Sequence, residues 1–163
     1  MVVKVYGLIV KELKRRDGEE LEEHFEIFHG QMDPVSERKI PRDFISPNSF
    51  VRVLVTTIAF GMGVSVKDVR EVFHWGPPSS LLGYWQEVGR CARDGLPGRA
   101  TMFLPSRSID RRIVDEAMIN LIRDKTMCIR RATMTALMVG GLTSQEVNAC
   151  SGGMRCCNRC SCL

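Results

Sequence analysis

The segment from Gln86 to Gly95 brings together side chains that could bind a polyphosphate. It reads Q-E-V-G-R-C-A-R-D-G, and on a helix Gln86, Arg90 and Arg93 would share one face at positions i, i+4 and i+7. An amide and two guanidinium groups suit phosphate oxygens, because arginine binds them in a bidentate manner and keeps its charge. On spacing alone, a solvated basic helix end explains the pattern equally well, so both interpretations stay open at this point.

Six of the seven cysteines lie from position 128 onward and could hold a metal ion. Four of them form the pattern C-x21-C-x6-C-x2-C: Cys128, Cys150, Cys157 and Cys160. Four thiolates suit tetrahedral zinc, and the close C-x2-C pair would supply two ligands from one turn. Cys156 or Cys162 could replace a neighbouring ligand, and cysteines without metal or in disulfides are the alternative.

The composition is that of a globular domain, since 44% of the 163 residues are hydrophobic and 26% are charged. No run of 18 apolar residues occurs, which argues against a membrane span. Charged residues such as Lys11 and Lys14 come too early for a signal peptide. We therefore expect a reducing compartment, which favours metal ligands over disulfides. A net charge of +4 permits nucleic acid as a partner without arguing for it.

These side chains need a scaffold, and the chain predicts one in which strands and helices alternate. Apolar, β-branched runs and turn residues predict strands at residues 25–29, 51–58, 71–75 and 100–104, the second of them buried. Helices are expected at residues 3–16, 34–45 and 79–91, the last with Ser79 or Ser80 as its N-cap. Pro41 should kink or end the second helix. The alternation predicts an α/β fold with a mainly parallel sheet flanked by helices.

After Pro105 the pattern changes to two helices, expected at residues 106–124 and 126–139, followed by the cysteine cluster. We therefore place a domain boundary near residues 105–110. One domain would cover residues 1–105, and a small helical zinc-binding module would cover residues 106–163.

The segment Q-E-V-G-R-C-A-R-D-G strongly resembles the last helicase motif of RecQ-like DNA helicases, which usually reads Q-E-x-G-R-A-G-R-D-G. Residues 53–64, V-L-V-T-T-I-A-F-G-M-G-V, resemble the preceding motif of that family. Phe28-His29-Gly30, followed by Arg38, resembles an earlier motif. The order and the gaps also fit, so the resemblance covers residues 3–163 and implies the second RecA-like lobe of such a helicase, clipped at its N-terminal side.

The resemblance implies a motor that clamps ATP and Mg²⁺ between two RecA-like lobes. Arg93 would be the arginine finger, worth roughly 10³ to 10⁵ in rate in comparable systems, with Arg90 beside it and Gln86 sensing the γ-phosphate. The implied nucleotide-binding set is Gly61, Gly63, Ser65, Gln86, Arg90 and Arg93. Gly30, Thr56 and Thr57 would contact the backbone of single-stranded or forked DNA, along which the motor moves in the 3′ to 5′ sense.

The same resemblance implies a zinc module after the second lobe. In the family, the first zinc-binding cysteine stands beside a pair of arginines, and here Cys128 is followed by Ile129-Arg130-Arg131. The segment Cys157-Asn158-Arg159-Cys160 resembles the family's C-D-x-C. A role in DNA repair and recombination, and an intracellular location with the nucleus preferred, follow from the family in the same way.

Two departures and one absence bear on what this chain does alone. Ser65 stands where the family has Asp, and Ala92 stands where it has Gly. The sequence contains neither a G-x-x-x-x-G-K-[ST] loop nor an acidic magnesium motif, so we expect no ATP hydrolysis by this chain alone. The alternative is a truncated or degenerate paralogue that only binds nucleic acid or a protein. A zinc-dependent interaction module on an inert α/β scaffold is a third possibility.

Overall fold

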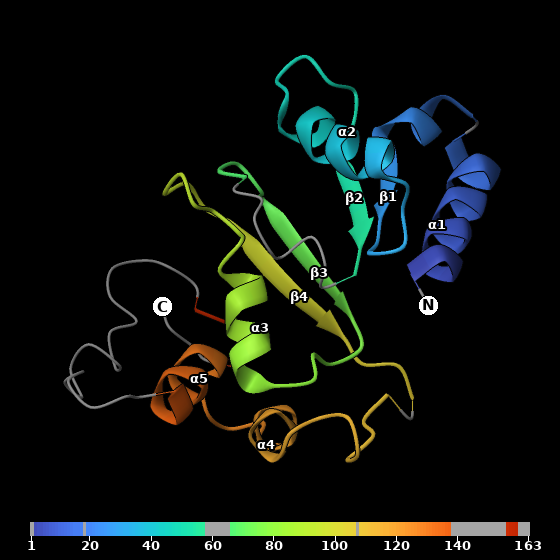
Figure 1. Ribbon diagram of the computed structural model, residues 1–163. Coiled ribbons are helices and arrows are strands. Elements are labelled where there is room, and N and C mark those ends of the chain that lie inside the picture. Colours follow the sequence, from blue (N-terminus) through green and yellow to red (C-terminus); the bar gives the residue numbers. More distant parts are fainter. Residues whose placement is uncertain (1, 18, 58–65, 107, 138–155, 160–163) are drawn as a thin grey trace. The chain divides into compact units, whose positions relative to one another are not determined.

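The computed structural model describes residues 2–17, 19–57, 66–106, 108–137 and 156–159 (Figure 1). Its contacts divide the chain into two compact units, Met1–Val66 and Lys67–Leu163. Each unit contains one pair of parallel strands with helices packed around it. The domain boundary expected near residues 105–110 stays a prediction.

The first unit pairs two short strands between helices: α1 (Val2–Asp17), the 3-10 helix η1 (Glu19–His24), β1 (Phe25–Phe28), α2 (Pro34–Ile45) and β2 (Val53–Thr56). β1 and β2 run parallel, with Phe28 opposite Thr56. α1 contacts both strands and α2 contacts β1. The buried apolar side chains come from α1, β1 and α2 and from the segments that flank β2: Val10, Phe28, Ile40, Val51 and Val66. The helix expected at residues 3–16 and the strand expected at residues 25–29 are therefore confirmed.

α2 confirms the helix expected at residues 34–45, and Asp33 is its N-cap. The side chain of Asp33 accepts hydrogen bonds from the backbone N–H groups of Val35 and Ser36, both at 3.0 Å, and Pro34 occupies the first turn. Pro41 does not end the helix, which continues to Ile45. Pro41 lacks the N–H that would donate one hydrogen bond within the helix. The side chain of Asp33 and the N–H of Ser46 satisfy backbone groups at the two ends of the helix, and the helix continues through Pro41.

β2 is less buried than the β-branched run predicts. Val53 is 38% exposed, and Thr56 is exposed as well. The expected strand extended to Ile58, which lies outside the described residues. A short apolar run predicts a strand but does not say whether both of its faces are covered, so the prediction of a buried strand was wrong for Val53.

The second unit contains β3 (Glu71–Trp75), α3 (Leu81–Val88), β4 (Arg99–Phe103), α4 (Glu116–Arg123) and α5 (Ile129–Leu137). β3 and β4 run parallel, with His74 opposite Met102, and the strands expected at residues 71–75 and 100–104 are confirmed. The three helices share a core with Met102 of the sheet, and its buried members are Leu81, Tyr84, Val114, Met118, Ile119, Leu121 and Ile122. Figure 1 shows α3 beside the β3–β4 pair.

The helices after Pro105 are shorter than expected, and aspartate side chains set where they begin. α4 starts only at Glu116, because the carboxylate of Asp115 accepts hydrogen bonds from the N–H groups of Met118 at 2.7 Å and Leu81 at 3.2 Å. α5 starts at Ile129 rather than at residue 126. The carboxylate of Asp124 binds the N–H of Thr126 at 2.8 Å in a turn that competes with the helix.

The observed strand pairs fit the α/β prediction. Both pairs are parallel, as expected, although each sheet in the described residues contains two strands. None of the described helices combines the length and the apolar character that crossing a bilayer requires.

Candidate functional site

α3 carries Gln86 and is fixed at both of its ends. The hydroxyl of Ser80 accepts a hydrogen bond from the N–H of Gly83 at 3.0 Å, which confirms Ser80 as one of the two N-caps expected. The helix ends at Val88, and the N–H of Gly89 donates to the carbonyl of Trp85 at 3.0 Å. Gln86 therefore lies on the last turns of α3, with its side chain exposed.

α3 is also held against the sheet by the residue that follows Gln86. The carboxylate of Glu87 approaches Nε2 of the buried His74 on β3 to 2.9 Å. The ring of His74 contacts the ring of the buried Tyr84, with centroids 5.5 Å apart. These contacts fix the orientation of α3, and therefore the direction in which the chain leaves it toward the arginines.

The arginines do not lie on that helix, which corrects the expected helix over residues 79–91. Residues 89–95 form successive turns, and Ala92 has φ +57°, in the left-handed region. A right-handed helix cannot continue through such a residue, so Gln86, Arg90 and Arg93 do not form one helical face. Instead, Arg90 and Arg93 lie in a loop, residues 89–98, which we call the arginine loop.

Backbone hydrogen bonds attach the arginine loop to the segment that leads into β3. The N–H of Ala92 donates to the carbonyl of Val69 at 2.9 Å, and the N–H of Asp94 donates to the carbonyl of Lys67 at 3.1 Å. Arg93 lies between these two attached residues and is exposed. Its Nε, which belongs to the guanidinium, donates to the carbonyl of Gly89 at 3.0 Å, so the side chain is bound within the loop itself.

The arginine loop also packs closely on its own return to β4. A Cβ on Gly98 would lie 2.5 Å from Sγ of Cys91 and 2.9 Å from Cβ of Ala92. The thiol of Cys91 donates to the carbonyl of Arg70 at 3.3 Å. Burial raises the pKa of this thiol above its ordinary value, so it stays protonated and able to donate. Cys91 is therefore a small packing residue at this crossing.

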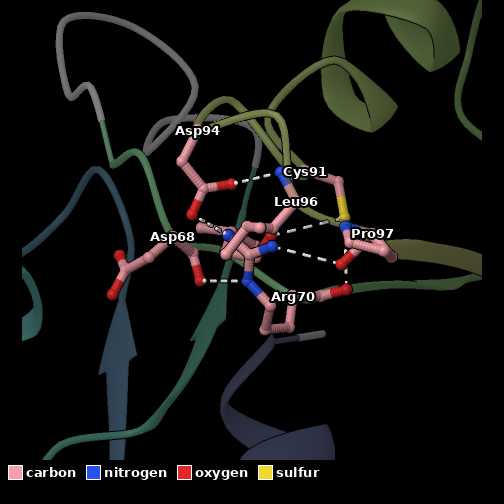
Figure 2. Close-up of polar contacts among 7 residues, drawn as sticks. Asp68, Arg70, Cys91, Asp94, Leu96 and Pro97 are labelled. Atoms are coloured by element: carbon pink, nitrogen blue, oxygen red, sulfur yellow. Dashed lines mark hydrogen bonds and ion pairs between the residues drawn. The ribbon is translucent and has the colours of Figure 1, made fainter.

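Sequence reasoning missed the residue that closes this arrangement, Arg70. Its guanidinium contacts residues 94–97 of the arginine loop (Figure 2). The sequence offers only indirect signals, because Asp94 belongs to the last helicase-like motif without an assigned role and Arg70 lies between the two motifs. A contact across so many intervening residues has no periodicity to reveal it.

The predicted DNA-contacting residues come together within the first unit. Thr56 ends β2, Thr57 follows it, and Gly30 lies just beyond the end of β1; all three are exposed. The N–H of Thr57 donates to the carbonyl of Phe28 at 3.2 Å, so the carboxyl ends of two parallel strands lie side by side here. Of the predicted nucleotide-binding set, Gly61, Gly63 and Ser65 lie outside the described residues.

Two of the four predicted zinc ligands lie within the described residues and approach each other. Sγ of Cys157 and Sγ of Cys128 are 3.7 Å apart. The N–H groups of Ile129 and Arg159 point to Sγ of Cys157 at 3.3 and 3.4 Å. Cys150 and Cys160 are not among the described residues. Within the described part of the chain, no three His, Cys, Asp or Glu side chains cluster as metal ligands would.

Comparisons with known proteins show the family to which this chain belongs. Residues 4–95 match the family described as the helicase conserved C-terminal domain. This match covers more than half of the chain, so the chain belongs to that family, which has a RecA-like α/β fold. The prediction of a RecA-like fold is thereby confirmed, whereas a zinc-binding subdomain does not follow from the family match.

The proteins similar to this chain are ATP-dependent helicases, and some of them are named RecQ or RecQ-like. The chain is 42% identical over 76 residues to the ATP-dependent DNA helicase RecQ of Haemophilus influenzae. The aligned segment covers 47% of this chain and 12% of that protein. The chain is 41% identical over 87 residues to the ATP-dependent DNA helicase Q4 of Homo sapiens, and this aligned segment covers 53% of this chain and 7% of that protein. A third relative, the ATP-dependent helicase wrn-1 of Caenorhabditis elegans, is 28% identical over 117 residues, or 69% of this chain and 11% of that protein.

These matches confirm the predicted resemblance, because they identify the chain as a RecQ-like helicase C-terminal region. The chain spans about an eighth or less of the length of these curated relatives.

Proposed function

We propose that this chain is the arginine-supplying part of a RecQ-like, ATP-dependent DNA helicase that moves in the 3′ to 5′ sense. One observation carries the proposal: Arg93 is exposed in a loop whose flanking residues, Ala92 and Asp94, are both hydrogen-bonded to the segment before β3. An exposed cation on a firmly attached loop can meet charge that develops on another surface without first reorganising.

Each of the predicted nucleotide-binding residues would have a distinct role in ATP hydrolysis. ATP with Mg²⁺ would be held by a phosphate-binding loop of a first lobe, a motif that this sequence does not contain. The guanidinium of Arg93 would stabilise charge on the γ-phosphoryl group in the transition state, with Arg90 as its neighbour at the lobe interface. Gln86, exposed at the end of α3, would sense the γ-phosphate through its amide. Gly61, Gly63 and Ser65 stay predicted members of the nucleotide-binding set.

We assign DNA contacts to the edge where β1 and β2 end. Gly30, Thr56 and Thr57 offer exposed backbone groups and hydroxyls there, which bind phosphates without reading the base sequence. The hydroxyl of Thr56 donates to the carbonyl of Thr57 at 2.7 Å and keeps its lone pairs as acceptors. Single-stranded or forked DNA would be the partner, and the nucleus the expected compartment.

We also propose zinc as a structural cofactor, bound by Cys128, Cys150, Cys157 and Cys160. Zinc–sulfur bonds of about 2.3 Å in a tetrahedron place two sulfurs about 3.8 Å apart, close to the 3.7 Å between Cys128 and Cys157. The backbone N–H groups directed at Sγ of Cys157 would stabilise the thiolate that zinc requires. Arg159 ties this turn to the core, because its Nη1 donates to the carbonyl of Leu121 at 2.9 Å.

The decisive experiment replaces Arg93 in a protein that joins this chain to a RecA-like lobe with a phosphate-binding loop. Arg93→Ala should lower kcat for DNA-stimulated ATP hydrolysis by about 10³ or more, because a finger acts on transition-state charge. The KM for ATP should change little, by less than about threefold. Arg112→Ala is the matched control, since Arg112 is an exposed arginine outside the loop and should leave kcat unaltered.

The result separates this proposal from its alternatives. If kcat stayed within about tenfold of the parent value, Arg93 would be a structural residue and Arg90 the better candidate for the finger. If the parent protein bound DNA but hydrolysed no ATP, the chain would be the non-enzymatic binding module that its departures at Ser65 and Ala92 allow.

A further inference from the structure

Arg70 lies outside both helicase-like motifs, yet its guanidinium contacts three separate points of the chain. Nε donates to the carbonyl of Asp68 at 3.0 Å and Nη1 donates to the carbonyl of Pro97 at 3.1 Å. Nη2 donates to Oδ2 of Asp94 at 2.5 Å. Figure 2 shows the guanidinium between the strand-entry segment and the far end of the arginine loop. One planar group thus connects the two segments.

Asp94, the partner of Arg70, is itself fixed by two further hydrogen bonds. Its Oδ1 accepts from the N–H of Leu96 at 3.1 Å, and its backbone N–H donates to the carbonyl of Lys67 at 3.1 Å. The guanidinium of Arg70 holds the pKa of the Asp94 carboxyl below its ordinary value, and the Leu96 bond acts in the same direction. Asp94 is therefore a carboxylate at neutral pH, and the pair is charged on both sides.

The exposure of this pair indicates that it acts on local geometry rather than on overall stability. The side chains of Arg70 and Asp94 keep 38% and 25% of their surface exposed. Ion pairs with this much solvent contact contribute little to the free energy of unfolding. The pair lies next to Arg93, where Ala92 and Gly95 both have positive φ values.

We propose that Arg70 is a positioning residue for Arg93: by holding Asp94 and Pro97, it keeps the arginine loop in the one conformation that presents Arg93. The inference rests on the proposed function of Arg93, whereas the attachment itself is a property of this chain alone. Lysine would not replace Arg70, because an ammonium cannot donate in the same plane to a carboxylate and two carbonyls. Asp94, which accepts the hydrogen bond from Arg70, has the same positioning role.

Hydrogen exchange on the 163-residue chain tests the attachment directly. In Arg70→Gln, the amides of Ala92 and Asp94 should exchange at least about tenfold faster, because the loop opens locally. Amides of the β3–β4 ladder should keep their rates, which also reports that the variant folds. Arg99→Gln is the matched control: it removes another exposed arginine, whose Nη1 lies 3.9 Å from Glu71, and should change neither loop amide.

Three further variants separate positioning from bulk stability. Asp94→Asn should accelerate the same two amides, and the double variant Arg70→Gln/Asp94→Asn should be no faster than either single one, because both remove one shared interaction. Arg70→Lys should exchange like Arg70→Gln. Additive effects, or full protection in Arg70→Lys, would overturn the role given to the planar fork.

The joined ATPase described above links the attachment to Arg93. Arg70→Gln should lower kcat about tenfold to a hundredfold with little change in the KM for ATP, since misplacing a transition-state group by about 1 Å has an effect of that size. Unaltered loop exchange, or an unaltered kcat while Arg93→Ala is impaired, would overturn this inference and leave the proposed function standing. If Arg93→Ala were fully active, the proposed function would fail, and accelerated loop exchange would still support the attachment by Arg70.

Discussion

Among the residues that the structure describes, Ala92 is the one non-glycine residue with a positive φ. It has φ +57° at a position where RecQ-like helicases usually have glycine, and its N–H is committed to the carbonyl of Val69. An L-residue with a Cβ loses roughly 1–2 kcal/mol in this region, whereas glycine adopts it freely. The sequence shows that Ala92 replaces the glycine of the family, and the structure adds that its Cβ strains the backbone.

Ala92→Gly should therefore stabilise the chain. Relief of the left-handed strain outweighs the extra entropy that glycine brings to the unfolded state, so the free energy of unfolding should rise by about 0.5–1 kcal/mol. Urea denaturation followed by circular dichroism measures this difference. Ala132→Gly serves as the control, because it lies within α5 and should destabilise by about 1 kcal/mol. Destabilisation by both substitutions would contradict the strain at Ala92.

At the scale of elements, the close crossing of the arginine loop and the start of β4 holds the site together. Gly98 lies in contact with Cys91 and Ala92, and a Cβ there would also lie 3.2 Å from the carbonyl of Arg70. Backbone and small side chains leave no room there for a side chain on Gly98. The small residues of the motif thus allow close packing between the arginine loop and the start of β4.

Gly98→Ala should consequently loosen the crossing and destabilise the chain by about 1–3 kcal/mol, the usual effect of overpacking. The thermal unfolding midpoint measures it. Adding Cys91→Ala should restore part of the loss, because it removes the sulfur that the new methyl group meets. Gly7→Ala provides the contrast: its Cβ would meet nothing within 4 Å and it lies inside α1, so a gain of about 1 kcal/mol is expected. A neutral Gly98→Ala would refute the close packing.

At the scale of the whole molecule, we expect one zinc ion to support the end of the chain. Metal analysis of the purified chain should find one equivalent, and Cys157→Ser or Cys128→Ser should abolish it, because each removes one of four thiolate ligands. Cys156→Ser is the neighbouring control and should retain the metal. Since metal binding in small zinc modules supplies on the order of 10 kcal/mol of folding free energy, chelation should unfold the end of the chain and spare β3 and β4. Zinc retained in Cys157→Ser would shift the ligand role to Cys156, and no zinc in any sample would exclude the site.

Local patterns were sufficient to predict most elements. The periodicity around Val5 and Leu13, the β-branched and aromatic runs and the capping serine predicted α1, the strands and the start of α3, because these depend on neighbours in the chain. The same patterns misjudged the ends of helices. Asp115 caps the start of α4, and Asp124 accepts a hydrogen bond in a turn before α5. The positive φ of Ala92 prevents a right-handed helix from continuing. None of these effects is visible in the spacing of apolar residues.

By itself, the sequence determined the family, the order of helices and strands, and the residue types that could act on a phosphate, because motif letters and periodicity are local information. Only the tertiary structure decided that Arg90 and Arg93 lie in a loop instead of on a helix, and that Arg70 and Asp94 hold that loop. It also decided that Cys128 and Cys157 meet. These facts depend on contacts between residues far apart in the chain, and the energies of such contacts follow from distance in space, which no spacing along the sequence contains.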